Sequence, residues 1–139
     1  MDQQFDILVI GSGPAGEGAA MMAAKNHRSV ALVERYFEVG GGCTHWGTIP
    51  SKAERHAVKT LHDLRRNPML REFLDVSRLG YPQLLASATK VVDAQVASRR
   101  RFYERNRVPI FVGEARFLDA RTVDVHPAQG KAIRLQGEQ

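Results

Sequence analysis

Residues 5–34 read FDILVIGSGPAGEGAAMMAAKNHRSVALVE, which is an apolar run, a glycine-rich turn, an alanine-rich stretch and a second apolar run. The first run, residues 5–10, contains β-branched side chains and stops at glycine, so it predicts a buried parallel strand. The alanine-rich stretch, residues 18–25, predicts a helix that opens with Pro14 and closes in cations, as the helix dipole favours. The second run predicts another buried strand, which ends at Glu34.

The turn between the first strand and the helix has the pattern Gly-x-Gly-x-x-Gly. Gly11 permits a tight turn, Gly13 leaves room for a pyrophosphate beside the backbone, and Gly16 lets helix and strand approach closely. The N-terminus of the helix offers free N–H groups and a partial positive charge to phosphates. Glu34 is placed to accept hydrogen bonds from ribose hydroxyls. These features predict a dinucleotide-binding unit; the alternative is a turn that binds no ligand.

The composition is that of one globular domain. The chain has 139 residues, of which 43% are hydrophobic and 25% are charged, and these values are normal for a soluble protein. No apolar run approaches the roughly 18 residues of a membrane helix, and residues 1–4 do not open a secretory signal, so we expect a cytoplasmic protein with no membrane partner. The single cysteine, Cys43, excludes a disulfide framework within the chain and a zinc site built from several cysteines, and we expect no metal site.

The chain is basic, with a formal charge of +5 and a pI of about 9.8. Such a charge is typical of nucleic-acid-binding proteins, but here the basic residues are interleaved with acids. The densest clusters, residues 65–66 and 99–101, fall in helix-like stretches, where a solvated helix face explains them more simply. We therefore expect no nucleic acid partner.

A glycine-rich loop is expected over residues 36–47, which include the consecutive glycines Gly40, Gly41 and Gly42. Three glycines in a row cost backbone entropy, so they favour a close approach of the main chain to a ligand. The alternative is a flexible linker.

Helical periodicity predicts two further helices. Apolar residues at helical spacing indicate an amphipathic helix over residues 53–61 that breaks at residues 67–68. Residues 69–82 are expected to be irregular, with a short helical turn around residues 70–74. A long helix is expected over residues 82–107, with an apolar stripe made of Leu85, Ala88, Val92, Val96 and Phe102.

The last part of the chain changes period. Residues 108–112 predict a third buried strand, closed by Gly113. Three short runs separated by turn residues, over 115–118, 122–126 and 132–135, predict an antiparallel meander.

Two stretches carry a family likeness: residues 5–34, and residues 41–52, which read GGCTHWGTIPSK. They resemble the FAD domain of the pyridine nucleotide–disulfide oxidoreductases, in which the second stretch follows the pattern Gly-Gly-x-Cys-x-x-x-x-Cys-x-Pro-x-Lys. The likeness spans essentially the whole chain. It is closest to the soluble pyridine nucleotide transhydrogenase branch, through residues 43–52 and the FYERN of residues 102–106.

The resemblance implies an α/β fold: a Rossmann-like FAD-binding parallel sheet with helices and an antiparallel β-meander, truncated. Residues 1–139 would be the N-terminal part of an FAD-binding domain, with the NAD(P) and dimerisation domains absent. The open side of the central sheet is then expected to expose apolar surface and an unpaired strand edge.

One departure from the disulfide reductases decides the implied chemistry. Those enzymes carry a second cysteine five positions after the first, and here that position is Thr48. Because a redox disulfide needs two thiols, the resemblance implies hydride chemistry through the flavin alone and Cys43 as a packed loop residue. The full-length parent would be a homo-oligomeric, Si-specific NAD(P) transhydrogenase that moves hydride between its substrates NADPH and NAD, and the fragment itself would be inactive.

Two alternatives stay open. One is an FAD-dependent reductase of the same family whose acceptor is not a disulfide. The other is a non-enzymatic truncated remnant that binds no flavin.

The resemblance also implies a set of FAD-binding residues and no catalytic residue. The glycine turn holds the FAD pyrophosphate, Glu34 binds the adenosine ribose, and residues 35–43 wrap both. Lys52 matches the family lysine near the flavin N5, where a cation favours the anionic reduced ring; without the resemblance it would be an ordinary surface lysine. The backbone of Ala115 faces adenine. The full set is Gly11, Gly13, Pro14, Ala15, Gly16, Glu34, Arg35, Tyr36, Phe37, Glu38, Val39, Gly40, Gly41, Gly42, Cys43, Thr44, Thr48, Lys52 and Ala115.

Overall fold

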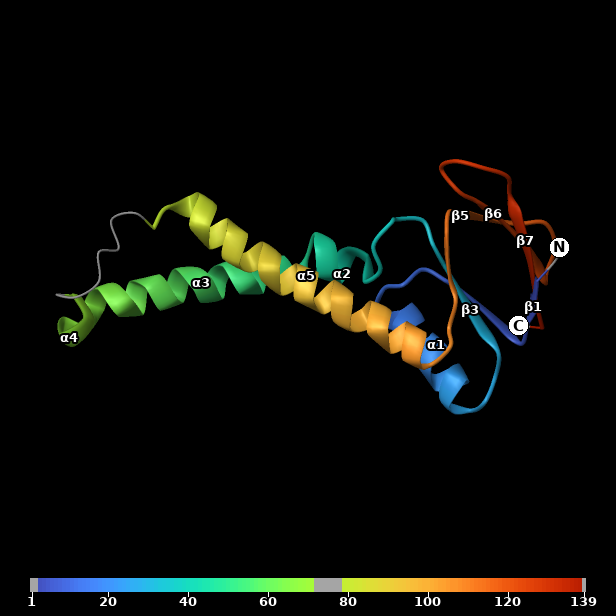
Figure 1. The fold of residues 1–139 in the computed structure, drawn as a ribbon, viewed down its shortest axis with the longest axis horizontal. Coiled ribbons are helices and arrows are strands. Elements are labelled where there is room, and N and C mark those ends of the chain that lie inside the picture. The colour runs from blue at the N-terminus through green and yellow to red at the C-terminus, as the bar shows by residue number, and fades with distance from the viewer. Residues whose placement is uncertain (1–2, 72–78, 139) are drawn as a thin grey trace. The chain divides into compact units, whose positions relative to one another are not determined.

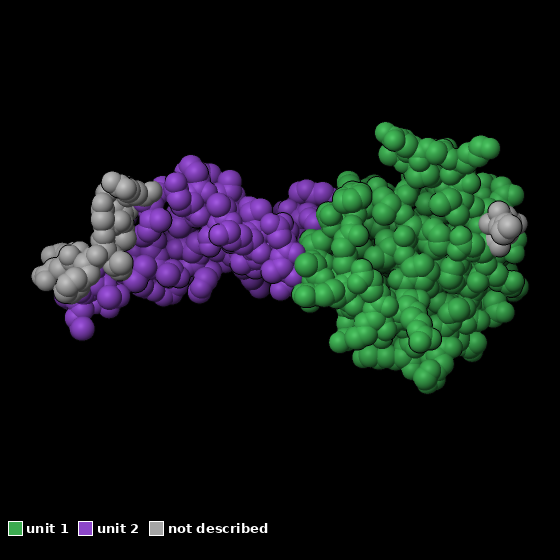
Figure 2. All heavy atoms as spheres, viewed as in Figure 1, with its two compact units in different colours: residues 1–41, 96–139 green, residues 42–95 purple. Residues whose placement is uncertain are grey.

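The computed structural model describes residues 3–71 and 79–138. The chain divides into two units, which Figure 2 colours separately. The first unit contains residues 1–41 and 96–139, and the second contains residues 42–95.

A parallel sheet of three strands forms the base of the first unit, in the order β2 (Ile7–Ile10), β3 (Val30–Glu34), β4 (Ile110–Val112). Helix α1 (Pro14–Lys25) connects β2 to β3 and packs against both strands through its buried Ala20, Met21 and Ala23 (Figure 1). The strand–helix–strand unit predicted from residues 5–34 is therefore confirmed.

The three parallel strands differ in burial. Every residue of β3 is buried, as predicted, because β3 is the central strand. The expectation that the other two strands are buried is wrong, since β2 and β4 are the outer strands of this sheet and leave Ile10 47% and Val112 38% exposed. Within the described residues each outer strand pairs on one side only, so the predicted apolar, unpaired strand edge is present.

A second sheet of four strands has the order β1 (Gln3–Phe5), β7 (Ile133–Gly137), β6 (Thr122–His126), β5 (Glu114–Phe117). Both β5–β6 and β6–β7 are antiparallel pairs, which confirms the predicted meander. Strand β1 joins it in parallel to β7, a pairing that the sequence pattern did not indicate.

The single strand predicted over residues 5–10 is divided at Asp6. The Asp6 carboxylate accepts hydrogen bonds from the Ser29 N–H at 2.6 Å and the Ser29 hydroxyl at 2.8 Å. These bonds hold the chain where it leaves one sheet and enters the other, so β1 and β2 belong to different sheets.

The core of the first unit lies where the two sheets meet. Val33 of the parallel sheet packs with a cluster from the meander, Val123, Val125 and Leu135. Phe5 and Phe111 meet edge to face beside this cluster, with ring centroids 6.1 Å apart. Gly113 carries the chain from β4 to β5, and a Cβ atom there would lie 2.7 Å from the His126 carbonyl oxygen. The mixed α/β fold predicted for the chain is confirmed.

Helices account for the rest of the described chain: α2 (Gly41–His45), α3 (Thr48–Arg66), α4 (Pro68–Arg71) and α5 (Tyr81–Arg105). The loop predicted over residues 36–47 is wrong in its second half, where α2 forms. Helix α3 begins five residues before the expected start and ends at Arg66, just before the expected break at residues 67–68. The helical turn expected around residues 70–74 lies mostly outside the described residues, and α4 covers residues 68–71.

The long helix predicted over residues 82–107 is confirmed as α5, but its apolar stripe differs from the expected one. Ala88 and Val96 are buried, whereas Leu85 is 41% exposed and Phe102 is only partly buried. Tyr103, one residue later, is the fully buried aromatic side chain of this helix. Within residues 3–71 and 79–138, no helix has the length and apolar character needed to cross a membrane.

Candidate functional site

The glycine turn between β2 and α1 has the geometry that its pattern predicts. Gly11 has φ +94° and donates its N–H to the Val33 carbonyl at 2.7 Å. A Cβ atom on Gly16 would lie 1.9 Å from the Gly11 carbonyl oxygen, so only glycine allows this approach of helix and strand. At Gly13, by contrast, an added Cβ would meet no atom within 4 Å.

The N-terminus of α1 is open to a ligand. Gly13 is its N-cap residue and Pro14 is its first residue, and no side chain of the described residues caps the helix. The first N–H groups of a helix have no partner within the helix and carry a partial positive charge. The open side of Gly13 therefore adjoins donors suited to a phosphate.

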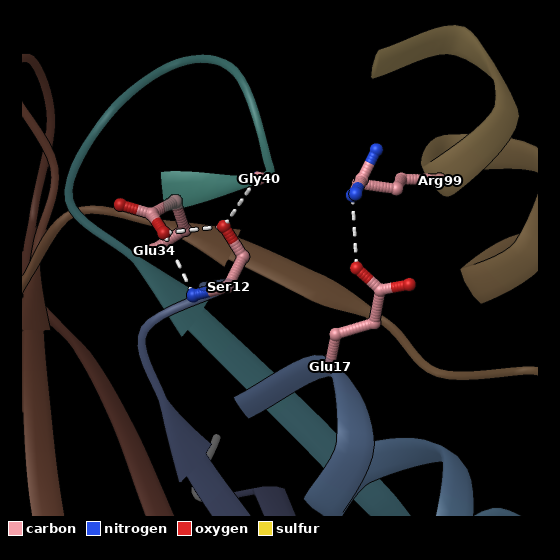
Figure 3. Close-up of polar contacts among 5 residues, drawn as sticks. All are labelled: Ser12, Glu17, Glu34, Gly40 and Arg99. Carbon is pink, nitrogen blue, oxygen red and sulfur yellow. Dashed lines mark hydrogen bonds and ion pairs between the residues drawn. The ribbon is translucent and has the colours of Figure 1, made fainter. Parts of the chain in front are cut away.

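A network of buried hydrogen bonds joins this turn to the end of β3 (Figure 3). Ser12 donates its N–H to Oε2 of Glu34 at 2.8 Å and its hydroxyl to the same oxygen at 2.5 Å. The Ser12 hydroxyl also accepts the Gly40 N–H at 2.8 Å. Ser12 is fully buried and Glu34 is 4% exposed, so this network holds three chain segments together away from water.

The Glu34 carboxylate is ionised more readily than its burial alone would allow. Burial raises the pKa of Glu34, but hydrogen bonds from the Ser12 hydroxyl and from the N–H groups of Tyr36, Ser12 and Arg35 lower it. The Tyr36 N–H donates to Oε1 at 3.0 Å. The hydrogen bonds outweigh burial, so the pKa of Glu34 lies below its ordinary value of 4.5. The site thus presents a negative charge at the end of β3.

The segment after Glu34 is fastened to α5 by Arg100. Its Nη2 donates to the Phe37 carbonyl at 2.7 Å and its Nε donates to Oε2 of Glu38 at 3.0 Å. The same guanidinium lies 5.4 Å from the centre of the Phe37 ring. Phe37 is nevertheless 73% exposed, so this segment carries an aromatic face open to solvent.

The run of glycines begins directly against the first glycine turn. Gly41 has φ +61°, and a Cβ atom there would lie 2.8 Å from the Gly13 Cα. Val39 and Gly40, which directly precede Gly41, are buried. In the first unit, then, the structure brings together the predicted residues of the glycine turn, Glu34 and the start of the glycine run.

Arg99 neutralises the acid in the first turn of α1. Its Nε donates to Oε2 of Glu17 at 2.9 Å, and both side chains are mostly buried (Figure 3). The expectation that residues 99–101 form a solvated face is wrong for Arg99 and Arg100, which are both partly buried in ion pairs. The pair keeps Glu17 from placing an unpaired negative charge beside the helix N-terminus.

Tyr103 lies near this pair. It is fully buried, and its hydroxyl has no hydrogen-bond partner among the described residues. Burial raises the pKa of Tyr103 to about 12, and the charge of Glu17 adds to that effect. The side chain is therefore neutral and fills space.

The remaining predicted site residues are placed separately. Gly42, Cys43, Thr44, Thr48 and Lys52 belong to the second unit. The expectation that Cys43 is a packed loop residue is wrong, because Cys43 lies in α2 and is exposed. Its Sγ lies 3.7 Å from the Thr48 hydroxyl, so Thr48 faces the lone thiol, while Lys52 is exposed on α3. Ala115 lies in β5 of the first unit, partly buried beside the core.

Sequence reasoning missed Ser12 and Arg100. Ser12 occupies a variable position between two motif glycines. One signal was present: its hydroxyl lies in a turn that, in this motif, comes close to the acid at the end of the next strand. Arg100 acts over 62 residues of sequence, and its cluster with other arginines gave no sign of a partner.

Comparison with known proteins identifies the family. The family model described as pyridine nucleotide-disulphide oxidoreductase matches residues 5–137. Soluble pyridine nucleotide transhydrogenases of Serratia proteamaculans, Pseudomonas aeruginosa and Colwellia psychrerythraea are 51%, 47% and 44% identical to the chain. Each match covers 97% of this chain and 29% of the relative, so the chain spans less than a third of their length.

Solved structures agree on the fold. The chain is similar to the C43S mutant of a HOCl-induced flavoprotein disulfide reductase from Escherichia coli in its Cu(II) complex, with a TM-score of 0.80 at 21% identity, over 99% of this chain and 27% of that one. At that identity the likeness shows the fold alone. The family model covers nearly the whole chain, and the chain belongs to the pyridine nucleotide-disulphide oxidoreductase family.

Proposed function

We propose that residues 1–139 form the N-terminal part of an FAD-binding domain. The whole protein would be a flavoprotein that transfers hydride between NADPH and NAD. The named relatives are soluble pyridine nucleotide transhydrogenases, which supports the activity, a cytoplasmic location and NAD(P) as substrates. The Si-specific stereochemistry and a homo-oligomeric state belong to the same proposal.

The open side of Gly13 carries this proposal. A ligand phosphate has room there, because an added Cβ would meet nothing within 4 Å. It would face the uncapped N-terminus of α1, where N–H groups and the helix dipole favour an anion. Glu34, at the end of the adjacent strand, supplies an ionised acceptor suited to ribose hydroxyls. The residues present therefore fit the adenosine and pyrophosphate part of FAD.

The other predicted residues complete the proposed FAD site. Gly11, Pro14, Ala15 and Gly16 would shape the phosphate-binding turn, and residues 35–43 would wrap the adenosine and the pyrophosphate. The backbone of Ala115 would face adenine and Lys52 would lie near the flavin, while Thr44 and Thr48 belong to the same proposed set. When bound, FAD would supply the hydride-accepting and hydride-donating ring, and a single thiol facing Thr48 leaves no disulfide to be reduced.

Two matched substitutions test the proposal. Gly13→Ala adds a methyl group to open space at an ordinary φ of −66°, and because alanine is a poorer N-cap than glycine we expect the free energy of unfolding to fall by about 0.5–1 kcal/mol. If a pyrophosphate lies against Gly13, the methyl group displaces it, and FAD affinity falls at least about tenfold, or 1.4 kcal/mol. The affinity is measured by flavin fluorescence and the stability by urea unfolding.

Gly18→Ala is the control, because a Cβ there also meets nothing within 4 Å but lies inside α1, away from its N-terminus. We expect it to stabilise the helix by about 0.5–1 kcal/mol and to leave FAD affinity unchanged. Equal FAD affinity of both variants would contradict the placement of the pyrophosphate. A purified wild-type protein with no flavin absorbance and no affinity for added FAD would contradict FAD binding.

The activity has its own test. The full-length protein should reduce thio-NAD with NADPH and should not reduce small disulfides. Disulfide reduction at a comparable rate would favour a different acceptor within the same family.

A further inference from the structure

The Ser12 side chain is the hub of the buried network at the glycine turn. Its hydroxyl accepts the Gly40 N–H at 2.8 Å and donates to Oε2 of Glu34, and its own N–H donates to that same oxygen at 2.8 Å. A hydroxyl has one proton to donate, and here that proton is committed to Glu34. The side chain has no exposed surface, so water does not substitute for any of these bonds.

The two donors from Ser12 make the two carboxylate oxygens of Glu34 different from one another. A carboxylate oxygen accepts about two hydrogen bonds, and Oε2 receives both of its bonds from Ser12. The Tyr36 N–H donates to Oε1 at 3.0 Å. In Figure 3 the second oxygen of Glu34 points away from Ser12. A ligand hydroxyl would therefore have to donate to Oε1.

The orientation of this carboxylate matters because so little of it is open. Only 4% of Glu34 is exposed, and a rotation of the carboxylate would change which oxygen meets a ligand. The backbone N–H groups of Ser12 and Tyr36 each donate to one oxygen, and the Arg35 N–H also interacts with the carboxylate. The Ser12 hydroxyl is the side-chain donor among these groups, and its bond with the Gly40 N–H fixes its position.

We infer that Ser12 is a positioning residue. Its hydroxyl orients the Glu34 carboxylate so that Oε1 can accept a hydrogen bond from a hydroxyl of the adenosine ribose of FAD. This inference rests on the proposed FAD site. Ser12, the variable residue between Gly11 and Gly13, would then have a role in ribose recognition. This role is separate from the phosphate contacts that the backbone of the turn would provide.

The test separates the ribose from the rest of the ligand. The affinities of the wild-type protein and of Ser12→Ala are measured for FAD and for an FAD analogue whose adenosine lacks both ribose hydroxyls. The wild-type protein should bind FAD more tightly than the analogue. In Ser12→Ala the ratio of the two affinities should fall at least about tenfold, because FAD binds more weakly while the affinity for the analogue stays at the wild-type value. Equal weakening toward both ligands, or no weakening, would overturn the inference, because a purely structural role does not distinguish them.

A second readout does not need a ligand. The Ser12 hydroxyl stabilises the ionised form of Glu34, so Ser12→Ala should raise the pKa of that carboxyl in a carbon-13 NMR titration. Thr89→Ala is the control, since Thr89 is exposed on α5 and its hydroxyl donates to the Leu85 carbonyl of the same helix. This variant should change neither the pKa of Glu34 nor the preference for FAD over the analogue. An unchanged pKa in Ser12→Ala would overturn the inference.

Two further variants keep the test decisive. If Ser12→Ala does not fold, Ser12→Gly removes the same hydroxyl and keeps the N–H donor, and the same results are expected. In Glu34→Gln the preference for FAD should already be lost, and adding Ser12→Ala should narrow it no further. Failure of the wild-type protein to bind FAD overturns the proposed function and the ribose role together, whereas failure of the variants alone overturns only the role of Ser12.

Discussion

Glu34 makes the stability of the first unit depend on pH. Its pKa is lower in the folded chain than the ordinary value of 4.5, because hydrogen bonds outweigh the opposing effect of burial. A lowered folded pKa gives stability that is present above the ordinary pKa and is lost as the pH falls through the folded value. We therefore expect the free energy of unfolding to fall as the pH drops below about 4.5.

Glu34→Gln should remove this share of the acid sensitivity. At neutral pH the amide should cost about 1–3 kcal/mol, because its NH₂ group would face N–H donors in a buried place. Urea unfolding across the acid range measures both effects. Glu114→Gln, at an exposed acid, is the control and should retain the wild-type slope, while an identical slope in Glu34→Gln would contradict the prediction. Asp6 and Asp119 also have lowered pKa values, so part of the slope should remain.

At Tyr103, unlike at Glu34, removal of a polar group is expected to raise the free energy of unfolding. Its hydroxyl is buried without a partner among the described residues, and an unsatisfied buried hydroxyl costs free energy. Tyr103→Phe should therefore stabilise the chain by up to about 1 kcal/mol. Thermal unfolding measures the change, with Tyr81→Phe at an exposed position as the control. Loss of more than about 0.5 kcal/mol in Tyr103→Phe would show that the hydroxyl has a partner.

Single residues show where sequence reasoning stops. Gly11 and Gly16 could be assigned from their pattern because the first has a positive φ and the second a close approach that only glycine allows. Ser12 could not, since its value depends on Glu34 and Gly40, which are 22 and 28 residues away. Phe102 was predicted to belong to the apolar stripe of α5, but the next residue, Tyr103, is the one that is buried in the core.

At the scale of elements, α1 and α5 end in the same way. In each, an asparagine donates its side-chain amide to the carbonyl four residues earlier, Asn26 to Met22 and Asn106 to Phe102. The next residue in each has a positive φ, 59° at His27 and 56° at Arg107. The Arg28 N–H then reaches the Ala23 carbonyl, and the Val108 N–H reaches the Tyr103 carbonyl. This bond pattern is the Schellman motif, in which glycine is usual at the position of positive φ.

His27→Gly should therefore stabilise the chain. A left-handed backbone conformation costs a residue with a side chain about 1–2 kcal/mol, and glycine avoids this cost. Glycine also loses more backbone entropy on folding, which offsets about 0.5–1 kcal/mol of the stabilisation. A net gain of about 0.5–1 kcal/mol is expected by urea unfolding. Lys25→Gly, at the last residue of α1, should instead destabilise by up to about 1 kcal/mol. If both variants lost stability equally, the helix end would not carry the expected strain.

Elements were predictable where local pattern and local structure coincide. Apart from the short helices α2 and α4, the order of helices and strands from Pro14 to Gly137 follows from periodicity and glycine positions, and so does the meander. Three features depend on contacts that sequence spacing does not show: the break at Asp6, the parallel pairing of β1 with β7, and the exposure of β2 and β4 as outer strands. Helix α2 was missed because consecutive glycines disfavour a helix.

At the scale of the whole molecule, the buried apolar residues are unevenly divided. The first unit contains the cluster of Val33, Val123, Val125 and Leu135, and its helix α1 buries three side chains. Helix α3, in the second unit, buries none. Because local opening is governed by how much buried surface an element loses, the two helices should differ in the free energy of opening.

Hydrogen exchange followed by mass spectrometry tests this difference. Comparing one helix with another removes the effect of secondary structure type, since both helices have regular backbone hydrogen bonds. Amides in the middle of α1 should exchange at least about tenfold more slowly than amides in the middle of α3, which corresponds to about 1.4 kcal/mol in opening free energy. Strand β3, buried along its whole length, should be at least as protected as α1 and serves as the internal reference. Equal protection in α1 and α3 would mean that α3 is covered in solution by a surface beyond its described contacts, and adding FAD to the same experiment would then show whether the cofactor supplies part of that cover.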